Sequence, residues 1–196
     1  MEAIIIGKGN SAIKLKRKDH PHKILVGINQ AVNLIDDPDY FVLNDIESLI
    51  GIKPSKLARI KNIIIPEYPH SVLKPGLDLN YKKFHQLIKE KFTGNLIVHN
   101  LHTTPKFNPK FITISERPKT SATIAVEYLL KFLGVKKIDF YGVGTGNGYH
   151  PYFMKILPNN LSNFSNNYNK RKPLRIKEFL IKLTAEKYPG STLNFH

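Results

Sequence analysis

The stretch that decides the fold is an apolar run followed by a small polar turn, Ala3-Ile4-Ile5-Ile6-Gly7-Lys8-Gly9-Asn10-Ser11-Ala12. The run is continuously apolar and mostly β-branched, without the alternation of a strand that has one face in water. Such a strand is typical of a parallel sheet whose two faces are both covered. The sequence therefore predicts a buried parallel strand whose carboxyl end opens into residues 7–12.

Similar runs predict further strands at residues 23–28, 40–43, 62–65, 96–99, 111–115, 138–141 and 192–195. Between them, apolar spacing predicts helices at 79–92, 123–133 (closed by Gly134) and 174–187. Together they predict an α/β fold: one Rossmann-like nucleotide-binding domain over residues 1–196, with a doubly wound, mostly parallel sheet and helices on both faces. Six asparagines in 159–169 predict a mobile lid near residues 155–173.

Composition narrows the class of protein. The 196 residues include no cysteine, which excludes disulfides, thiolate metal sites and cysteine nucleophiles. No stretch approaches the roughly 18 apolar residues of a membrane span, so we expect a soluble, cytoplasmic protein. The 30 Lys+Arg against 15 Asp+Glu give a net charge of +15, which predicts polyanionic partners such as phosphorylated ligands or nucleic acid. The alternative is that the charge only reflects a lysine-rich composition.

The first polar turn fits the pattern G-x-G-x-x-A through Gly7 and Gly9, whose small size lets backbone N–H groups approach a phosphate. Walker A is excluded because no Gly-Lys-Ser/Thr closes the turn. A nicotinamide site would need an acidic residue at the end of the second strand, where Asn29 stands. A tight turn without any ligand remains the alternative.

Other polar residues also follow predicted strands, where ligands of doubly wound sheets bind. Neutral amides there can both donate to and accept from a ribose, base or sugar, although each asparagine could instead be an ordinary turn residue. Asp45 could bind a sugar hydroxyl, hold Mg²⁺ or simply cap the next helix. These candidates are Asn10, Ser11, Asn29, Gln30, Asn44 and Asp45.

Thr120 or Ser121 is placed to cap the long apolar helix, so that its first N–H groups face the same cleft. A helix N-terminus attracts phosphate, although ordinary capping needs no ligand. Arg117 and Lys119 add positive charge just upstream.

Residues 142–153 form a glycine-rich segment that carries Gly142, His150 and Tyr152. A histidine can act as general base and a tyrosine hydroxyl can donate to a leaving phosphate. An exposed hairpin with ordinary aromatic residues is the alternative. The histidines show no metal-ligand spacing, and we predict no metal site.

In their order and spacing, these motifs in residues 3–48 and 119–195 resemble the bacterial sialyltransferases with a single Rossmann-like domain, and the wider group with archaeal hydroxymethyl-dihydropterin diphosphokinase-like proteins. The resemblance implies that Asn10, Ser11, Asn29, Thr120 and Ser121 bind a nucleotide donor. It also implies that Tyr152 stabilises the departing phosphate.

Two departures from the family pattern matter. The sialyltransferases take their general base from a histidine in the lid, whereas residues 159–173 contain none and carry Lys170 and Arg171 instead. The wider group commonly has an aspartate where this chain has Gly144. The general base could therefore be His150, another residue, or absent, and Lys170 and Arg171 are the candidate phosphate-neutralising residues.

The leading hypothesis is a glycosyltransferase that moves a sugar from a nucleotide-sugar donor to a glycan or to a modified base in nucleic acid, with no resident cofactor. One alternative is a pyrophosphotransferase in which Asp45 holds Mg²⁺. Another is a non-catalytic module that binds nucleotides or nucleic acid.

Overall fold

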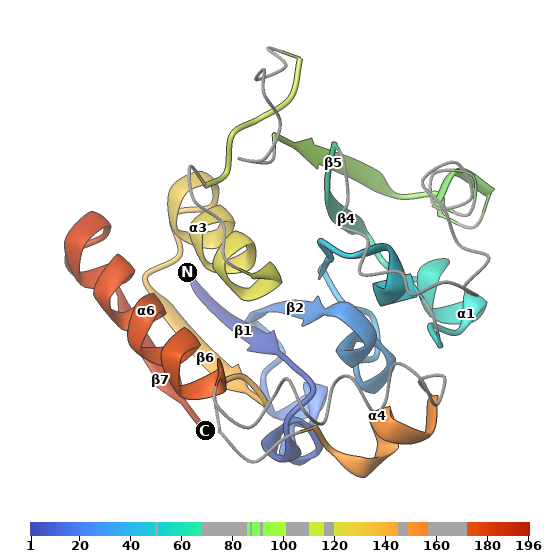
Figure 1. Cartoon of the computed structure of the whole chain (residues 1–196), viewed down its shortest axis with the longest axis horizontal. Coiled ribbons are helices and arrows are strands. Elements are labelled where there is room, and N and C mark those ends of the chain that lie inside the picture. Colours follow the sequence, from blue (N-terminus) through green and yellow to red (C-terminus); the bar gives the residue numbers. More distant parts are fainter. Residues whose placement is uncertain are drawn as a thin grey trace.

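At the centre of the fold is a seven-stranded sheet, parallel throughout, with the strand order β5-β4-β3-β2-β1-β6-β7 (Figure 1). The strands are β1 (Glu2–Ile6), β2 (Ile24–Ile28), β3 (Tyr40–Val42), β4 (Asn62–Pro66), β5 (Asn95–His99), β6 (Lys137–Tyr141) and β7 (Thr192–Phe195). The computed structural model describes residues 1–49, 51–67, 86, 88–90, 92–100, 110–115, 120–144, 149–156 and 172–196. The sheet confirms the predicted α/β Rossmann-like class.

The helices are of two kinds. The longer α-helices are α3 (Ser121–Phe132) and α6 (Lys172–Lys187), while α1 (Pro54–Leu57) and α4 (Pro151–Ile156) are short. Four 3₁₀ helices follow the first three strands: η1 (Asn10–Lys14), η2 (Arg17–Asp19), η3 (Asn29–Leu34) and η4 (Ile46–Leu49). None of the helices in the described ranges is long and apolar enough to cross a membrane.

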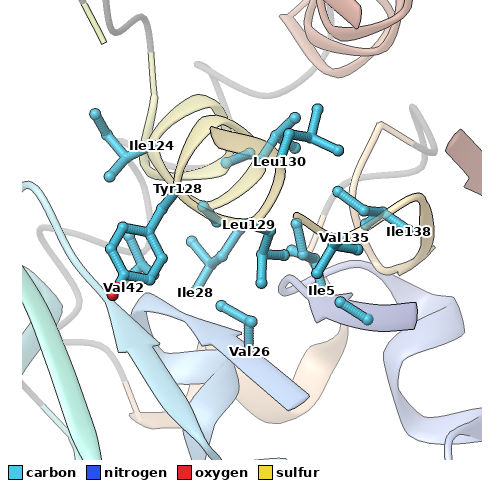
Figure 2. Close-up of a cluster of buried hydrophobic side chains, with 14 of the residues drawn as sticks. Ile5, Val26, Ile28, Val42, Ile124, Tyr128, Leu129, Leu130, Val135 and Ile138 are labelled. Atoms are coloured by element: carbon cyan, nitrogen blue, oxygen red, sulfur yellow. The ribbon is translucent and has the colours of Figure 1, made fainter. Parts of the chain in front are cut away.

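The longer helices cover one face of the sheet. Side chains from alternate positions of β1 and β2, such as Ile5 and Val26, pack under α3, and Leu180 of α6 joins the same cluster beside Ile138. Figure 2 shows Tyr128 and Leu129 of α3 above Ile28 and Val42 of the sheet. The apolar face of α3 thus fixes the position of its N-terminus over the sheet.

The short helices cover the opposite face. There Ile4, Ile6 and Leu25 pack against Ala12 of η1 and Phe153 of α4. Further along the same face, Phe41 and Ile63 pack against residues of η4 and α1, including Leu49 and Leu57. Because both sides of each central strand are buried, the strands show no alternation of polar and apolar residues.

One predicted strand is wrong. In residues 111–115, only Ile112 forms a bridge, to His99 at the end of β5, with the Asn100 N–H donating to the Ile112 carbonyl over 2.8 Å. Ile114 is instead buried in the cluster under α3. Residues 111–113 are half-buried and residues 114–115 are buried, and such burial does not require a continued backbone ladder.

Two of the predicted helices are confirmed, whereas the third helix and the lid lie partly outside the described residues. The predicted helices at 123–133 and 174–187 correspond to α3 and α6, and Gly134 ends α3 with φ of 63°. Of the predicted helix at 79–92, residues 86, 88–90 and 92 are described; residues 86 and 88–90 are helical, and Phe92 is not. Most of the predicted lid, residues 157–171, lies outside the described residues.

Candidate functional site

The direction of the strand order reverses at β1. From β1 the chain builds the sheet outward through β2 to β5, and it then returns through α3 to add β6 on the other side of β1. In open α/β sheets, ligands bind beyond the carboxyl ends of the strands at such a reversal. The residues that follow β1, β2 and β6 are therefore the first to consider.

Between β1 and β6 the glycines serve close packing of backbone against backbone. The Gly7 N–H donates to the Tyr141 carbonyl over 2.8 Å, and the Gly9 N–H donates to the Gly142 carbonyl over 2.9 Å. A Cβ atom on Gly7 would lie 2.5 Å from the Gly142 carbonyl oxygen, and one on Gly142 would lie 2.8 Å from Gly7 O. These two N–H groups are used within the protein and are therefore not available to a phosphate.

Ser11 strengthens the same junction. Its hydroxyl donates to the His196 carbonyl over 2.7 Å and accepts the Gly142 N–H over 2.7 Å. The hydroxyl thereby joins η1, the end of β6 and the residue after β7. Asn10, one position earlier, is exposed at the start of η1.

Asn29 links three elements at the end of β2. Its backbone has φ of 53°, in the left-handed region that asparagine tolerates better than most residues. Its Oδ1 accepts hydrogen bonds from Ser48 Oγ of η4 at 2.8 Å and from Ser121 Oγ of α3 at 3.3 Å. Among the described residues these are its only side-chain hydrogen bonds, so Nδ2 keeps both N–H donors for a ligand or water.

The N-terminus of α3 lies beside Asn29. Thr120 is the N-cap, and its hydroxyl accepts the Thr123 N–H at 3.3 Å. Ser121 is 5% exposed and reaches Asn29. Two predicted site residues far apart in sequence, Asn29 and Ser121, therefore meet in the structure.

Asn44 and Asp45 follow β3, next to the end of β2. Asn44 is buried, and its Oδ1 has no hydrogen-bond partner in the described part of the chain. Asp45 is half-buried, and its carbonyl accepts the Ser48 N–H at 3.0 Å. The sequence analysis missed Ser48, whose only hint was its place three residues after Asp45.

Lys8 is the second residue that the sequence analysis missed. Its Nζ donates to Gln30 Oε1 over 3.2 Å and lies 4.1 Å from the centre of the Tyr149 ring. The motif treats this position as variable, so the pattern alone gave Lys8 no role. The structure places an ammonium group where β1 and β2 end.

His150 begins α4. Its N–H donates to the Lys8 carbonyl over 2.8 Å, next to a β-bridge between Gly9 and Tyr149. Its Nδ1 accepts the Tyr152 N–H at 3.2 Å, which leaves the proton of the neutral imidazole on Nε2. A role as base at Nδ1 therefore requires that this bond opens. The half-buried ring of Tyr152 packs edge-on against Phe153.

Two further polar groups lie away from this site. His99, at the end of β5, is fully buried, and burial lowers its pKa to about 4 although its Nδ1 hydrogen-bonds the Asn100 carbonyl at 3.0 Å. Asp139 of β6 accepts from Lys23 Nζ at 2.7 Å and Asn194 Nδ2 at 2.8 Å. Burial acts to raise the pKa of the Asp139 carboxyl, but these bonds and the charges of Lys23 and Lys137 outweigh it and lower the pKa.

Several predicted residues cannot be placed. Lys170 and Arg171 lie outside the described residues, as do Arg117, Lys119 and residues 145–148 of the glycine-rich segment. Within the described ranges, no group of three or more histidine or acidic side chains could hold a metal ion.

No family model, curated protein or solved structure matches this chain. Amides, hydroxyls and one ammonium group meet at the ends of β1, β2 and β3, and the half-buried Asp45 adds one carboxylate after β3. The amides, hydroxyls and ammonium group can donate hydrogen bonds to hydroxyls and phosphates.

Proposed function

We propose that the chain is a transferase that binds a nucleotide-sugar donor at the carboxyl ends of β1, β2 and β3 and moves the sugar to a glycan or to a modified base in nucleic acid. The observation that carries the proposal is the anchoring of Asn29 by Ser48 and Ser121. Two hydroxyls hold the amide oxygen, so the amide is fixed in one orientation with its donors available. A fixed donor loses less conformational entropy on binding than a free one.

The location supports the same ligand class. Asn29 lies beside the first turn of α3, whose N–H groups and dipole favour a phosphate. Lys8, hydrogen-bonded to the neighbouring Gln30, adds a positive charge. A nucleotide offers phosphate for these groups and ribose hydroxyls for the amides.

The proposed reaction is a direct displacement. An oxygen or nitrogen atom of the acceptor attacks the anomeric carbon of the sugar, and the bond from that carbon to the phosphate oxygen breaks. The nucleoside phosphate leaves with the electron pair, and a base takes the acceptor's proton. Hydrogen-bond donors around the leaving phosphate stabilise its growing charge.

In this reaction, Tyr152 would donate to the phosphate and His150 would be the base. His150 can accept the proton at Nδ1 only after that atom releases the Tyr152 N–H. A rearrangement at the start of α4 when the donor binds would release the Tyr152 N–H and so meet this requirement. The resemblance to the sialyltransferases is the source of the Tyr152 role, whereas His150 is chosen because it is the only histidine in residues 142–153 of the sequence.

The test is a thermal-shift screen of nucleotides and nucleotide sugars, in which a ligand at about 100 times its dissociation constant stabilises the protein by about 2.7 kcal/mol. Hydrolysis and transfer assays with any hit follow, with and without a chelator. Loss of activity in the chelator would favour the Mg²⁺-dependent pyrophosphotransferase, with Asp45 as ligand. Binding without turnover would favour a non-catalytic module.

The charge of +15 adds a test of the acceptor. If the acceptor is nucleic acid, affinity for single-stranded DNA should fall linearly with salt on logarithmic axes, because binding releases counterions. Fluorescence anisotropy at two salt concentrations measures this. Absence of binding at low salt would point to a glycan or small-molecule acceptor.

A further inference from the structure

Lys8 is held in place by two uncharged groups. Gln30, which is 2% exposed, accepts a hydrogen bond from its Nζ at 3.2 Å, and the ring of Tyr149 lies 4.1 Å from the same atom. The Gln30 side chain comes from η3 and Tyr149 comes from the segment before α4. The ammonium group of a half-buried lysine is thus positioned by contacts from two other parts of the chain.

The other half-buried cations differ from Lys8 in their partners. Four of them form ion pairs with carboxylates: Arg17 with Asp39, Lys23 with Glu2 and Asp139, Lys56 with Asp36, and Lys137 with Glu2. Lys177 lies 5.2 Å from the ring of Phe195, on the face that carries α6. Within the described ranges, Lys8 has no ion-pair partner.

This difference has an electrostatic consequence. A positive charge that is partly shielded from water is stabilised by an anion more strongly than an exposed one, because the local dielectric constant is lower. A neutral amide oxygen and an aromatic ring stabilise the ammonium group without cancelling its charge. Lys8 therefore keeps its capacity to bind an anion.

We propose that Lys8 binds a phosphate group of the ligand and, in the transferase of the preceding section, neutralises the leaving phosphate. This role rests on the proposed function. The place fits it, because Gln30 directly follows Asn29, so that the ammonium group and the Asn29 amide lie at the end of the same strand. Lysine binds phosphate as a point charge, without the fork geometry of arginine.

The amide-lined side of the site and Lys8 then have separate tasks. Asn29, Ser48 and Ser121 form a neutral group suited to hydroxyls and to a base edge. Lys8 supplies the charge that such a group lacks. Loss of Lys8 should weaken the binding of ligands in proportion to their phosphate charge, and it should leave the binding of an uncharged nucleoside unchanged.

The experiment titrates inorganic pyrophosphate into the full chain at low ionic strength, with binding followed by calorimetry. The variants are Lys8→Gln, Lys8→Arg and the control Lys14→Gln, which removes an equal charge from an exposed position on η1. We expect Lys8→Gln to weaken pyrophosphate binding by about 10- to 100-fold, as for a lost charged hydrogen bond. Lys8→Arg should retain most of the affinity, and Lys14→Gln should change it little.

Two results would overturn the proposal. One is equal affinity for pyrophosphate in Lys8→Gln and Lys14→Gln, which would mean that the ion responds only to the overall positive charge. The other is no binding of pyrophosphate to the unmodified chain. Circular dichroism monitors folding, and Lys8→Arg keeps the test valid if Lys8→Gln does not fold.

The same titration separates this proposal from the proposed transferase. If pyrophosphate binds through Lys8 but no nucleotide or nucleotide sugar binds, the phosphate site stands and the transferase fails. If nucleotides bind as well to Lys8→Gln as to the unmodified chain, the role of Lys8 fails and the nucleotide site stands.

Discussion

Ser121 Oγ donates a hydrogen bond to Asn29 Oδ1 over 3.3 Å and so joins residues that lie 92 positions apart in the chain. The bond ties the first turn of α3 to the end of β2. Ser48 adds a second hydroxyl to the same oxygen at 2.8 Å. These two hydrogen bonds fix the orientation of the Asn29 side chain, whose backbone is left-handed, whereas the side chain of an ordinary turn residue is not fixed by other elements.

Asn29→Asp should weaken ligand binding while the protein still folds. Both serine hydroxyls can still donate to a carboxylate, whereas the two N–H donors are lost and a negative charge is added near the phosphate. We expect a nucleotide or nucleotide sugar found by the screen to bind at least about tenfold more weakly. Calorimetry measures the change.

Asn95→Asp is the matched control, since it adds the same charge at the amino end of β5, at an exposed position. Equal affinity in Asn29→Asp and Asn95→Asp would remove Asn29 from the binding site.

His150→Asn should separate the two roles of His150. Asparagine is a good N-cap and can accept the Tyr152 N–H, but it cannot act as a base at neutral pH. If His150 is the base, turnover should fall by about 10²–10⁴-fold in both His150→Asn and His150→Ala. His150→Asn should melt closer to the unmodified chain than His150→Ala. Full turnover in His150→Asn would place the base elsewhere.

Gly142→Ala should destabilise the fold more than Gly134→Ala. Both glycines have positive φ, of 69° and 63°, so the backbone penalty of an L residue is similar. A methyl group on Gly142 meets Gly7 O at 2.8 Å and Ala12 Cβ at 2.9 Å, whereas on Gly134 it meets nothing within 4 Å. We expect an extra loss of about 1–3 kcal/mol from overpacking, measured by urea denaturation. Equal losses of unfolding free energy in the two variants would mean that the backbone between β1 and β6 shifts enough to accommodate the methyl group.

His99 should make the chain less stable in mild acid. Its folded pKa is about 4 against an ordinary value of 6.5, so the unfolded state binds a proton first as the pH falls from 6.5 towards 4. The free energy of unfolding should drop by on the order of 2 kcal/mol between pH 7 and pH 5 through this group alone. Urea denaturation at several pH values measures it.

His99→Gln is the comparison, since it does not titrate. The drop between pH 7 and pH 5 should shrink in this variant, and an unchanged drop would rule out His99 as its source. Glu2, Asp36 and Asp139 have lowered pKa values and titrate below this window.

Lys23→Met should remove the nearest cation from the Asp139 carboxylate. The Nζ of the half-buried Lys23 lies 2.7 Å from a carboxylate side chain that is 9% exposed, and loss of a charged hydrogen-bond partner costs about 1–3 kcal/mol. The double variant with Asp139→Asn should recover part of the loss, because the amide carries no charge. Chemical denaturation of the four proteins gives the coupling, and strict additivity would contradict it.

The pH dependence of this pair has a defined sign. Since the pKa of Asp139 lies below its ordinary value of 3.8, the stabilisation is present above pH 3.8 and is lost as the pH falls through the folded pKa.

The sequence by itself determined the strands and the class of the sheet. Continuous apolar runs such as residues 3–6 occur where both faces of a strand are buried, and this requirement is local, so the pattern carries it. It also determined which strand ends are polar, and it gave Thr120 or Ser121 as the cap of α3, of which the structure shows Thr120. Asn29 and Ser121 were predicted as site residues on this basis.

Only the tertiary structure decided which of these residues meet. Ser48 reaches Asn29, and Lys8 lies between Gln30 and Tyr149, because the order of the strands brings their loops to one edge of the sheet. The register of β1 against β6 brings the glycines of the first turn against the backbone that follows β6, and residues 111–115 form one bridge, to the end of β5, while Ile114 is buried under α3. Such contacts join positions far apart in the chain, and they depend on packing that no local pattern of residues records.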